Sequence, residues 1–305
     1  MLVLLWGLES DRPLAAVRQE LADRGVPFEF ADQMQVLDSD ARLTVSETIA
    51  ASLRVKDREF DLSTVTAAYL RPYEVQRVPT VAAEGPQSAA WRHAAEFQDI
   101  IASWSAITPA LVVNRLEAMG SNNSKPYQSR LIHKLGFAVP ETLVTTDPAA
   151  AQAFWEEHGT VIYKSVSGVR SRVARLGPEH AVRLRDVSSC PTQFQKYIAG
   201  TDHRVHVVGD EVFACEVLCG ADDYRYPGPN GVQLRACDLP EDVRDQCRRL
   251  AAAMHLSVAG IDLRRTPKDE WVCFEVNPSP AFTYYERPTG QPIAHAIATL
   301  LTGAN

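Results

Sequence analysis

Residues 258–277 read VAGIDLRRTPKDEWVCFEVN, in which two apolar runs flank the turn-forming residues TPKD. A turn centred on Lys268 and Asp269 predicts an antiparallel hairpin with strands at 259–264 and 271–277. Side chains alternate between the two faces of a strand, so this register gives the hairpin one apolar face. The pairs expected on that face are Ile261 with Val276 and Leu263 with Phe274.

The other face of this hairpin is acidic. Asp262 lies opposite Glu275, and Asn277 follows Glu275 two residues later on the same side. Facing carboxylates repel one another unless a cation lies between them, and Arg264 on the same face offers part of that charge. A divalent cation does so better, and these hard oxygen ligands suit magnesium bound together with phosphates. The alternative is a solvated polar face.

Two lysines supply the opposite charge. Lys164 ends the apolar run VIYK, where a buried stem would direct the ammonium group over a sheet face, and Lys125 lies in SNNSKP. Each alone is typical of a surface lysine whose stem lies along apolar groups. Together with the acidic hairpin they indicate a site for a magnesium-bound polyphosphate.

The N-terminal third opens as strand–helix–strand, at 2–6, 14–22 and 26–30, with Gly25 ending the helix. This is an α/β opening without a G-x-G-x-x-G sequence, so a dinucleotide site is not expected there. Further along, the periodicity and the capping residues predict more elements. They are helices at 126–135, 148–158 and 240–254 and strands at 161–164, 204–208 and 212–217, the last two joined at Gly209-Asp210.

The composition narrows the class of protein. The chain has 305 residues, of which 46% are hydrophobic, and its net charge of -7 argues against nucleic acid as a partner. The start, MLVLLWGLESDRP, lacks a basic region and predicts a strand and not a signal peptide. No apolar stretch is long enough for a membrane span. Six cysteines without a C-x-x-C pair indicate buried thiols in a reducing compartment, so a cytoplasmic location is expected.

Several segments, in this order and spacing, resemble the ATP-grasp superfamily from Lys125 to about Ile297. They are NNSKPYQSRLIHKLGFAVPETLVTTDP, VIYKSVSG, FQKYIAGTDHRVHVVGDEVFA, DDYRY and VAGIDLRRTPKDEWVCFEVNPSPAFTYYERPTGQPIA. The similarity is to the branch of RimK-like glutamate ligases and peptide-modifying, graspetide-type ligases. The implied fold is α/β, with ATP clasped between two antiparallel sheets. The implied subdomains are N-terminal (1–113), central (114–197) and C-terminal (198–305).

The resemblance also implies roles for individual residues. The ligands of magnesium would be Asp262, Glu275 and Asn277. The ATP contacts would be Lys125 and Lys164 on the phosphates and Asp202 on the ribose. Gln195, Lys196, Tyr197 and Ile198 would bind adenine, largely through backbone groups. Arg225 in DDYR would act with Lys164 in catalysis, at the γ-phosphate or the acyl phosphate.

The sequence departs from the family pattern in two places. The phosphate-covering loop 165–172, SVSGVRSR, has one glycine flanked by Arg170 and Arg172, so either arginines replace bare backbone amides or the loop orders when ATP binds. In the N-terminal region only AYLRPYE is suggestive. Arg71 and Glu74 there, with Arg170 and Arg172, are candidate substrate contacts, although such arginines are more often surface residues.

The function that the resemblance implies is an ATP-dependent carboxylate–amine ligase that works through an acyl phosphate. Its expected cofactors are ATP and two Mg²⁺ ions, which Mn²⁺ would replace. Its partners would be a carboxylate donor and an amine or hydroxyl acceptor, small molecule or peptide, and family members are often homodimers or homotetramers. The alternatives are a macrocyclising or ester-forming peptide ligase, a small-molecule cyclising ligase, an ATP-grasp phosphotransferase and a non-catalytic nucleotide-binding protein.

Overall fold

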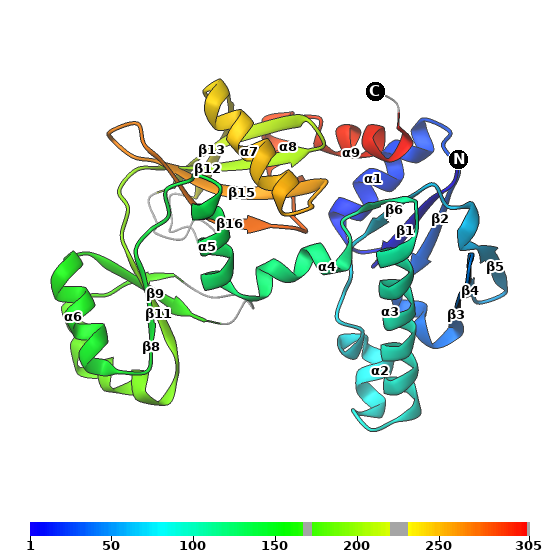
Figure 1. Cartoon of the computed structure of the whole chain (residues 1–305), viewed down its shortest axis with the longest axis horizontal. Helices are drawn as coiled ribbons and strands as arrows, with labels where there is room; N and C mark the ends of the chain where they lie inside the picture. The colour runs from blue at the N-terminus through cyan, green and yellow to red at the C-terminus, as the bar shows by residue number, and fades with distance from the viewer. Residues whose placement is uncertain (167–172, 220–230, 304–305) are drawn as a thin grey trace.

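The computed structural model describes residues 1–166, 173–219 and 231–303. Within these residues the strands form four sheets, arranged in three regions of the molecule (Figure 1). No helix in the described ranges combines the length and apolarity that crossing a bilayer requires. The fold is mixed α/β, as expected.

The N-terminal region contains a parallel sheet in which every residue of β1 and β6 is buried. Its strands, in spatial order, are β2 (Phe28–Asp32), β1 (Val3–Gly7), β6 (Ala67–Leu70) and β7 (Leu111–Val113). A second, antiparallel sheet consists of β3 (Ser39–Val45), β4 (Ile49–Val55) and β5 (Arg58–Asp61). The helices are α1 (Arg12–Asp23), α2 (Pro79–Glu84) and α3 (Ala89–Ile107), with short turns η1 (Gln33–Asp38), η2 (Leu62–Thr64) and η3 (Val75–Arg77).

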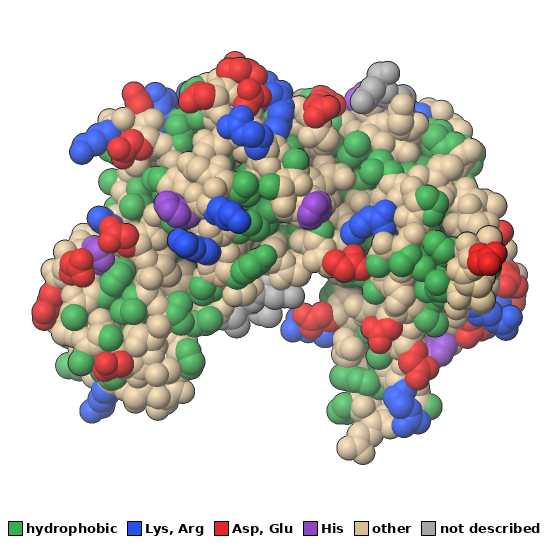
Figure 2. Space-filling model, in the orientation of Figure 1, with side chains coloured by type: hydrophobic (Ala, Val, Ile, Leu, Met, Phe, Trp, Pro, Cys, Tyr) green, Lys and Arg blue, Asp and Glu red, His purple; other side chains and the backbone are tan. Residues whose placement is uncertain are grey.

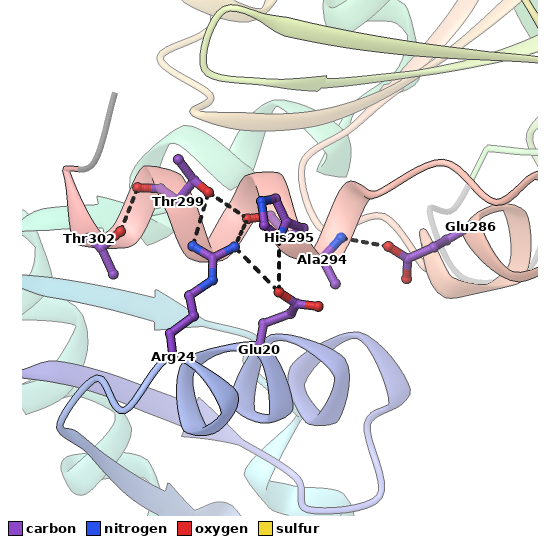
Figure 3. Close-up of polar contacts among 7 residues, drawn as sticks. All are labelled: Glu20, Arg24, Glu286, Ala294, His295, Thr299 and Thr302. Atoms are coloured by element: carbon purple, nitrogen blue, oxygen red, sulfur yellow. Dashed lines mark hydrogen bonds and ion pairs between the residues drawn. The ribbon is translucent and has the colours of Figure 1, made fainter.

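Helix α1 lies beside the last helix of the chain, α9 (Ile293–Thr302), so the two ends of the sequence meet (Figures 1 and 3). Arg24 of α1 donates to the Thr299 hydroxyl at 3.0 Å and to the His295 carbonyl at 2.7 Å. Glu20 accepts from Arg24 at 3.3 Å and contacts the His295 ring nitrogen Nδ1 at 3.2 Å. These contacts join the N-terminal region to the C-terminal one.

The central sheet is antiparallel and is covered by α6 (Pro148–His158) and η5 (Pro178–Ser189). Its strands are β10 (Ala174–Arg175), β9 (Val161–Ser165), β11 (Thr192–Lys196) and β8 (Thr142–Thr145). The predicted ends of α6 are confirmed. Asp147 caps the first turn by accepting from the Ala149 N–H at 2.9 Å, and Gly159 ends the helix at a φ of 69°.

The C-terminal sheet packs on α7 (Glu241–Ala253) through a core that includes Val243, Cys247 and Leu250. Its strands are β14 (Val232–Cys237), β13 (Glu211–Cys219), β12 (Thr201–Val208), β15 (Val258–Arg265) and β16 (Trp271–Asn277). Helix α5 (Lys125–Lys134) contacts β16, and α8 (Thr283–Thr289) contacts β14. The remaining described elements are α4 (Leu116–Met119) and η4 (Gly120–Asn123), which lead into α5.

The hairpin β15–β16 has the predicted register at one end only. Ile261 pairs with Val276, but Leu263 pairs with Cys273 and not with Phe274, so that expectation was wrong. A β-bulge after Asp262 leaves Phe274 as the extra residue. The bulge keeps Leu263 and Cys273 in the apolar core while turning Phe274 towards the opposite side.

The six cysteines are free thiols, and Cys215, Cys247 and Cys273 are buried as expected. Burial raises the pKa of Cys247 to about 12, so this thiol behaves as an apolar group. Cys190 differs from the expectation because it is exposed.

Candidate functional site

A cleft of about 490 Å³ lies between the central sheet and the C-terminal sheet. In Figure 1 the two sheets form the left part of the molecule. The notch at the lower edge of the space-filling view is a separate feature, between the central region and the N-terminal region (Figure 2). The lining side chains come from both sheets, from α5 and from α8. They are Lys125, Ile162, Lys164, Val173, Gln195, Tyr197, Ile198, Asp202, Arg204, Asp262, Arg264, Phe274, Glu275, Asn277, Ala281, Tyr284 and Tyr285.

The proposed metal ligands lie together on the cleft side of β15 and β16. Asp262 pairs directly with Glu275, and Gly260 pairs with Asn277, as the hairpin register predicted. All three ligand candidates line the cleft and are partly exposed to it. The Asn277 side-chain oxygen accepts from the Ser279 N–H at 2.9 Å, which fixes the direction of the amide.

The cation beside this acidic pair is Arg204 and not Arg264. Arg204 of β12 pairs with Asp262 across the strands and donates to its carboxylate at 2.7 Å. Its guanidinium lies over the Tyr285 ring at 5.6 Å, and its side chain is 6% exposed. A Cβ on Gly260 would meet the Arg204 Nη2 at 2.1 Å, so glycine is required for the guanidinium to lie there.

Arg264 instead shapes the opposite end of the cleft. It donates to both carboxylate oxygens of Asp202, at 2.7 and 2.9 Å, and to the Ile198 carbonyl at 2.7 Å. The bidentate pair holds Asp202 in one orientation at the cleft wall. Tyr197 lies beneath the Arg264 guanidinium at 5.7 Å, which completes a shallow wall at this end.

The two lysines approach the cleft from different elements. Lys164 lies on β9, two residues after Ile162, on the face that lines the cleft. Lys125 is the first residue of α5 and also lines the cleft. Both lysines are half-buried. The acidic and the basic groups therefore share one cavity.

Gln195 is the most buried polar group at the adenine end predicted for the cleft. It is 3% exposed and donates to the Thr142 hydroxyl at 3.0 Å. Its carbonyl oxygen has no hydrogen-bond partner among the described residues. A buried acceptor on a cleft wall is stabilised by a ligand donor, and an amino group of a base would supply one.

Three of the candidate residues lie away from the cleft lining. Lys196 extends from β11 to Glu141, with 2.9 Å between ammonium and carboxylate. Arg71 is buried in the N-terminal region and pairs with Asp11 at 2.7 Å. Glu74 is exposed and pairs with Arg77 at 2.7 Å. The structure therefore does not bring these side chains into the cavity that holds the others.

The candidates Arg170, Arg172 and Arg225 lie outside the described residues, as do most of the loop 165–172 and the DDYR sequence. Their predicted roles at the phosphates and the substrate stay predictions.

Among the cleft residues that sequence reasoning missed are Arg204, Phe274, Tyr284 and Tyr285. Polar residues occupy every second position of β12, at Asp202, Arg204 and His206, so they share one face of the strand. Phe274 lines the cleft because of the bulge. The residue types of the hairpin do not predict that bulge. The tyrosines lie in AFTYYE, directly after the metal-ligand strand.

The donor set fits the groups that the sequence predicted. Two carboxylates and an amide oxygen on adjacent strands are hard oxygen ligands suited to Mg²⁺. Lys164 on the central-sheet wall and Lys125 at the start of α5, which contacts β16, suit phosphate oxygens. Ile162 and Phe274 on opposite sheets supply apolar surface for a planar base.

Comparison with known proteins gives the family. The RimK-like ATP-grasp domain matches residues 122–301, more than half of the chain. A probable alpha-L-glutamate ligase of Haemophilus influenzae (strain PittEE) is 27% identical over 195 residues, which are 61% of this chain and 65% of that protein. The matched part thus spans less than two thirds of that relative.

Solved structures share the fold over the whole chain. The macrocyclase MdnC of Microcystis aeruginosa MRC, bound with precursor peptide MdnA, superposes with a TM-score of 0.84 at 21% identity and covers all of both chains. The ATP-grasp ligase PsnB, complexed with minimal precursor, Mg and ADP, gives 0.79 at 25% identity, with 99% of this chain and 96% of that one covered. By its sequence match and its two-sheet cleft, this chain belongs to the RimK-like ATP-grasp family.

Proposed function

We propose that this protein is an ATP-dependent ligase that activates a carboxylate as an acyl phosphate and joins it to an amine or hydroxyl group. The observation that carries the proposal is the shared cavity. Lys164 of the central sheet and Lys125 of α5 line the same cleft as the acidic group of Asp262, Glu275 and Asn277. ATP bound with magnesium needs both sets of charges at once.

Different residues of the cleft bind different parts of ATP. Gln195, Tyr197 and Ile198 hold the base, and Asp202, oriented by Arg264, accepts the ribose hydroxyls. Lys125 and Lys164 bind the phosphates. Arg204, beside Asp262, stabilises the negative charge that develops when the γ-phosphoryl group moves to the substrate carboxylate.

Asp262, Glu275 and Asn277 would hold magnesium, which would supply positive charge to the phosphates. We infer two Mg²⁺ ions, which Mn²⁺ can replace, as the family resemblance implies. Arg225, Arg170 and Arg172 would complete the phosphate and substrate contacts.

The substrate we propose is a peptide whose own side chains supply the carboxylate and the acceptor. What supports this is the similarity to MdnC and PsnB, each solved with its precursor peptide. Both superpose over 99–100% of this chain, the N-terminal region included. Addition of free glutamate to a protein or peptide is the second candidate, favoured by the names of the curated relatives.

The test measures ADP release together with the mass of the product. The full chain, ATP and Mg²⁺ are incubated with a panel of short peptides that carry one Glu or Asp and one Lys, Ser or Thr, with and without free glutamate. The expected result is ADP formation coupled to loss of one water from a peptide. Hydroxylamine added to the same reaction should trap the acyl phosphate as a hydroxamate.

Other products would exclude the proposal. A peptide that gains a phosphoryl group identifies a phosphotransferase, and a peptide that gains a glutamate residue identifies the second candidate. ATP that binds without turnover across the panel indicates a non-catalytic nucleotide-binding protein. A Lys125→Met, Lys164→Met double variant serves as the control for contaminating ATPases.

A further inference from the structure

β16 ends the spatial order of the C-terminal sheet, and an edge strand exposes N–H and C=O groups on alternate residues. Near its start the edge is bonded by backbone, since the Cys273 N–H donates to the Ala138 carbonyl at 2.9 Å. Near its end side chains take over: the carbonyl of Val276 in β16 and those of Pro278 and Pro280 in the loop after it each accept a hydrogen bond from a side chain outside the sheet. The donors are Gln128 Nε2 at 2.7 Å, Asn114 Nδ2 at 2.7 Å and Arg71 Nη1 at 3.2 Å.

Gln128 makes the closest equivalent of a strand pairing. Its amide nitrogen donates to the Val276 carbonyl, and its amide oxygen accepts from the Val276 N–H at 3.0 Å. Gln128 is 2% exposed, so these bonds form without competition from water. Val276 lies between Glu275 and Asn277, the two candidate metal ligands of this strand. Gln128 also lies one turn after Lys125 on α5.

Asn114 joins the same segment to the start of β15. Its amide nitrogen donates to the carbonyls of Val258 and Pro278, and its oxygen accepts from the N–H groups of Ser257 and Val258. The side chain is 2% exposed and uses both its donor and its acceptor. It therefore fixes the strand that carries Asp262 relative to the loop that follows Asn277.

Arg71 completes the series from the N-terminal region. Its guanidinium is held by Asp11 through two contacts, at 2.7 and 3.2 Å, while one nitrogen donates to Pro280. The side chain is 8% exposed and does not line the cleft. It therefore contacts the loop after Asn277 from the side of the N-terminal region.

We propose that Gln128, Asn114 and Arg71 form an edge clamp that positions the metal ligands Glu275 and Asn277. The proposal rests on the proposed function, because it assigns these residues to the metal site of that reaction. Magnesium requires near-ideal octahedral geometry, and ligands on an unsupported edge strand would not keep it. Groups that hold ligands in place typically contribute about 10- to 100-fold to metal affinity.

The experiment compares two buried glutamines that make the same pair of bonds. Gln128→Met removes both bonds to Val276 at nearly constant volume. Gln33→Met is the matched control, because Gln33 is 1% exposed and clasps Tyr73 through its N–H and carbonyl at 2.8 and 3.2 Å, within the N-terminal region. Mn²⁺ is titrated into each full-length protein in the presence of ADP, and free Mn²⁺ is measured by electron paramagnetic resonance.

We expect the Mn²⁺ dissociation constant to rise about 10-fold in Gln128→Met and to stay at the wild-type value in Gln33→Met. Affinity for ADP without metal should be the same in all three proteins, since Gln128 does not line the cleft. A wild-type Mn²⁺ constant in Gln128→Met overturns the clamp. Wild-type protein that takes up no Mn²⁺ with ADP would instead refute the proposed function.

Arg71→Lys provides a second, milder variant in case Gln128→Met does not fold. Lysine keeps the charge beside Asp11, but it cannot bond two carboxylate oxygens and the Pro280 carbonyl in the fork geometry of arginine. A smaller rise of the Mn²⁺ constant in the same direction supports the clamp. An unchanged constant in this folded variant contradicts it.

Discussion

At the scale of single residues, the facing pair Asp262–Glu275 is expected to oppose folding and to serve the binding of a cation. Directly opposed like charges destabilise a sheet, and Arg204 donates to the Asp262 carboxylate. Replacing one member of such a pair is therefore expected to lower the activity without lowering the free energy of unfolding.

Glu275→Gln tests this separation. The change keeps the shape of the side chain and removes the repulsion with Asp262, so the free energy of unfolding should stay constant or rise by up to about 1 kcal/mol. Loss of a group that only supports a metal ligand costs up to about 100-fold in activity, and loss of a ligand itself should cost more. ATP turnover should therefore fall by more than about 100-fold. Urea denaturation and ADP release measure the two effects, with Glu270→Gln in the exposed turn as the control. Retained turnover would remove Glu275 from the metal site.

His206 predicts the pH dependence of stability. It is fully buried against the Tyr285 ring at 5.1 Å, and this burial, with the charge of Arg204, holds the pKa of His206 well below its usual range. The unfolded chain binds a proton at this residue below about pH 6.5, whereas the folded chain does not. The free energy of unfolding should therefore fall as the pH drops below that value, by up to about 1.4 kcal/mol per pH unit from this one residue.

Replacing His206 with Phe should make that slope shallower. Urea denaturation between about pH 7 and pH 5 measures it, and exposed His133→Phe is the control. An unchanged slope in the His206 variant would show that another group carries the acid sensitivity.

Residues of the site differed in how far the sequence could place them. Asp262, Glu275 and Asn277 were predictable because a hairpin register relates residues that are close along the chain. Arg204 was not, because its place beside Asp262 depends on the pairing of β12 with β15, which are separated by α7 and about half of the C-terminal region. Non-local pairing is set by tertiary packing, which local patterns do not report.

At the scale of elements, the capping residues predicted the ends of α6 correctly, whereas the predicted register of β15–β16 was correct at one end only. Asp147-Pro148 and Gly159 bound α6 as expected, because caps act through neighbours in the chain. The bulge at Phe274 was missed, since the extra residue results from packing Leu263 and Cys273 into the core together.

The C-terminal end of α7 offers a stability test at this scale. His255 follows the helix at a φ of 57°, a left-handed conformation that glycine adopts without strain. His255→Gly should raise the free energy of unfolding by about 0.5–1 kcal/mol. The same change at exposed His133, in the last turn of α5, should not raise it, because His133 has no positive φ for glycine to relieve. A destabilised His255→Gly protein would show that the imidazole makes a contact worth more than the strain.

At the scale of the whole molecule, the end of β16 and the loop after it are bonded from several parts of the chain. Gln128 contacts the strand, Asn114 and Arg71 contact the loop, and α9 returns to α1 through Arg24 and Glu20 (Figure 3). The sequence predicted two sheets around a nucleotide through its family resemblance. It did not predict this bracing, because buried glutamines and asparagines look like ordinary polar residues in a sequence. The division at residues 113 and 197 stays a prediction.

Because both sheets line the cleft, a nucleotide that binds there should link them. We expect ADP with Mg²⁺ to slow amide hydrogen exchange in β11 and in β15–β16 at the same time, while the β3–β4–β5 sheet of the N-terminal region exchanges as before. At a ligand concentration of about 100 times the dissociation constant, binding stabilises the folded state by about 2.7 kcal/mol. Amides that exchange only after an unfolding event that releases the ligand should then exchange roughly 100-fold more slowly. Protection of one sheet alone would mean that the nucleotide lies on one wall. The opposing wall, with either its lysine or its carboxylates, would then have no part in binding it.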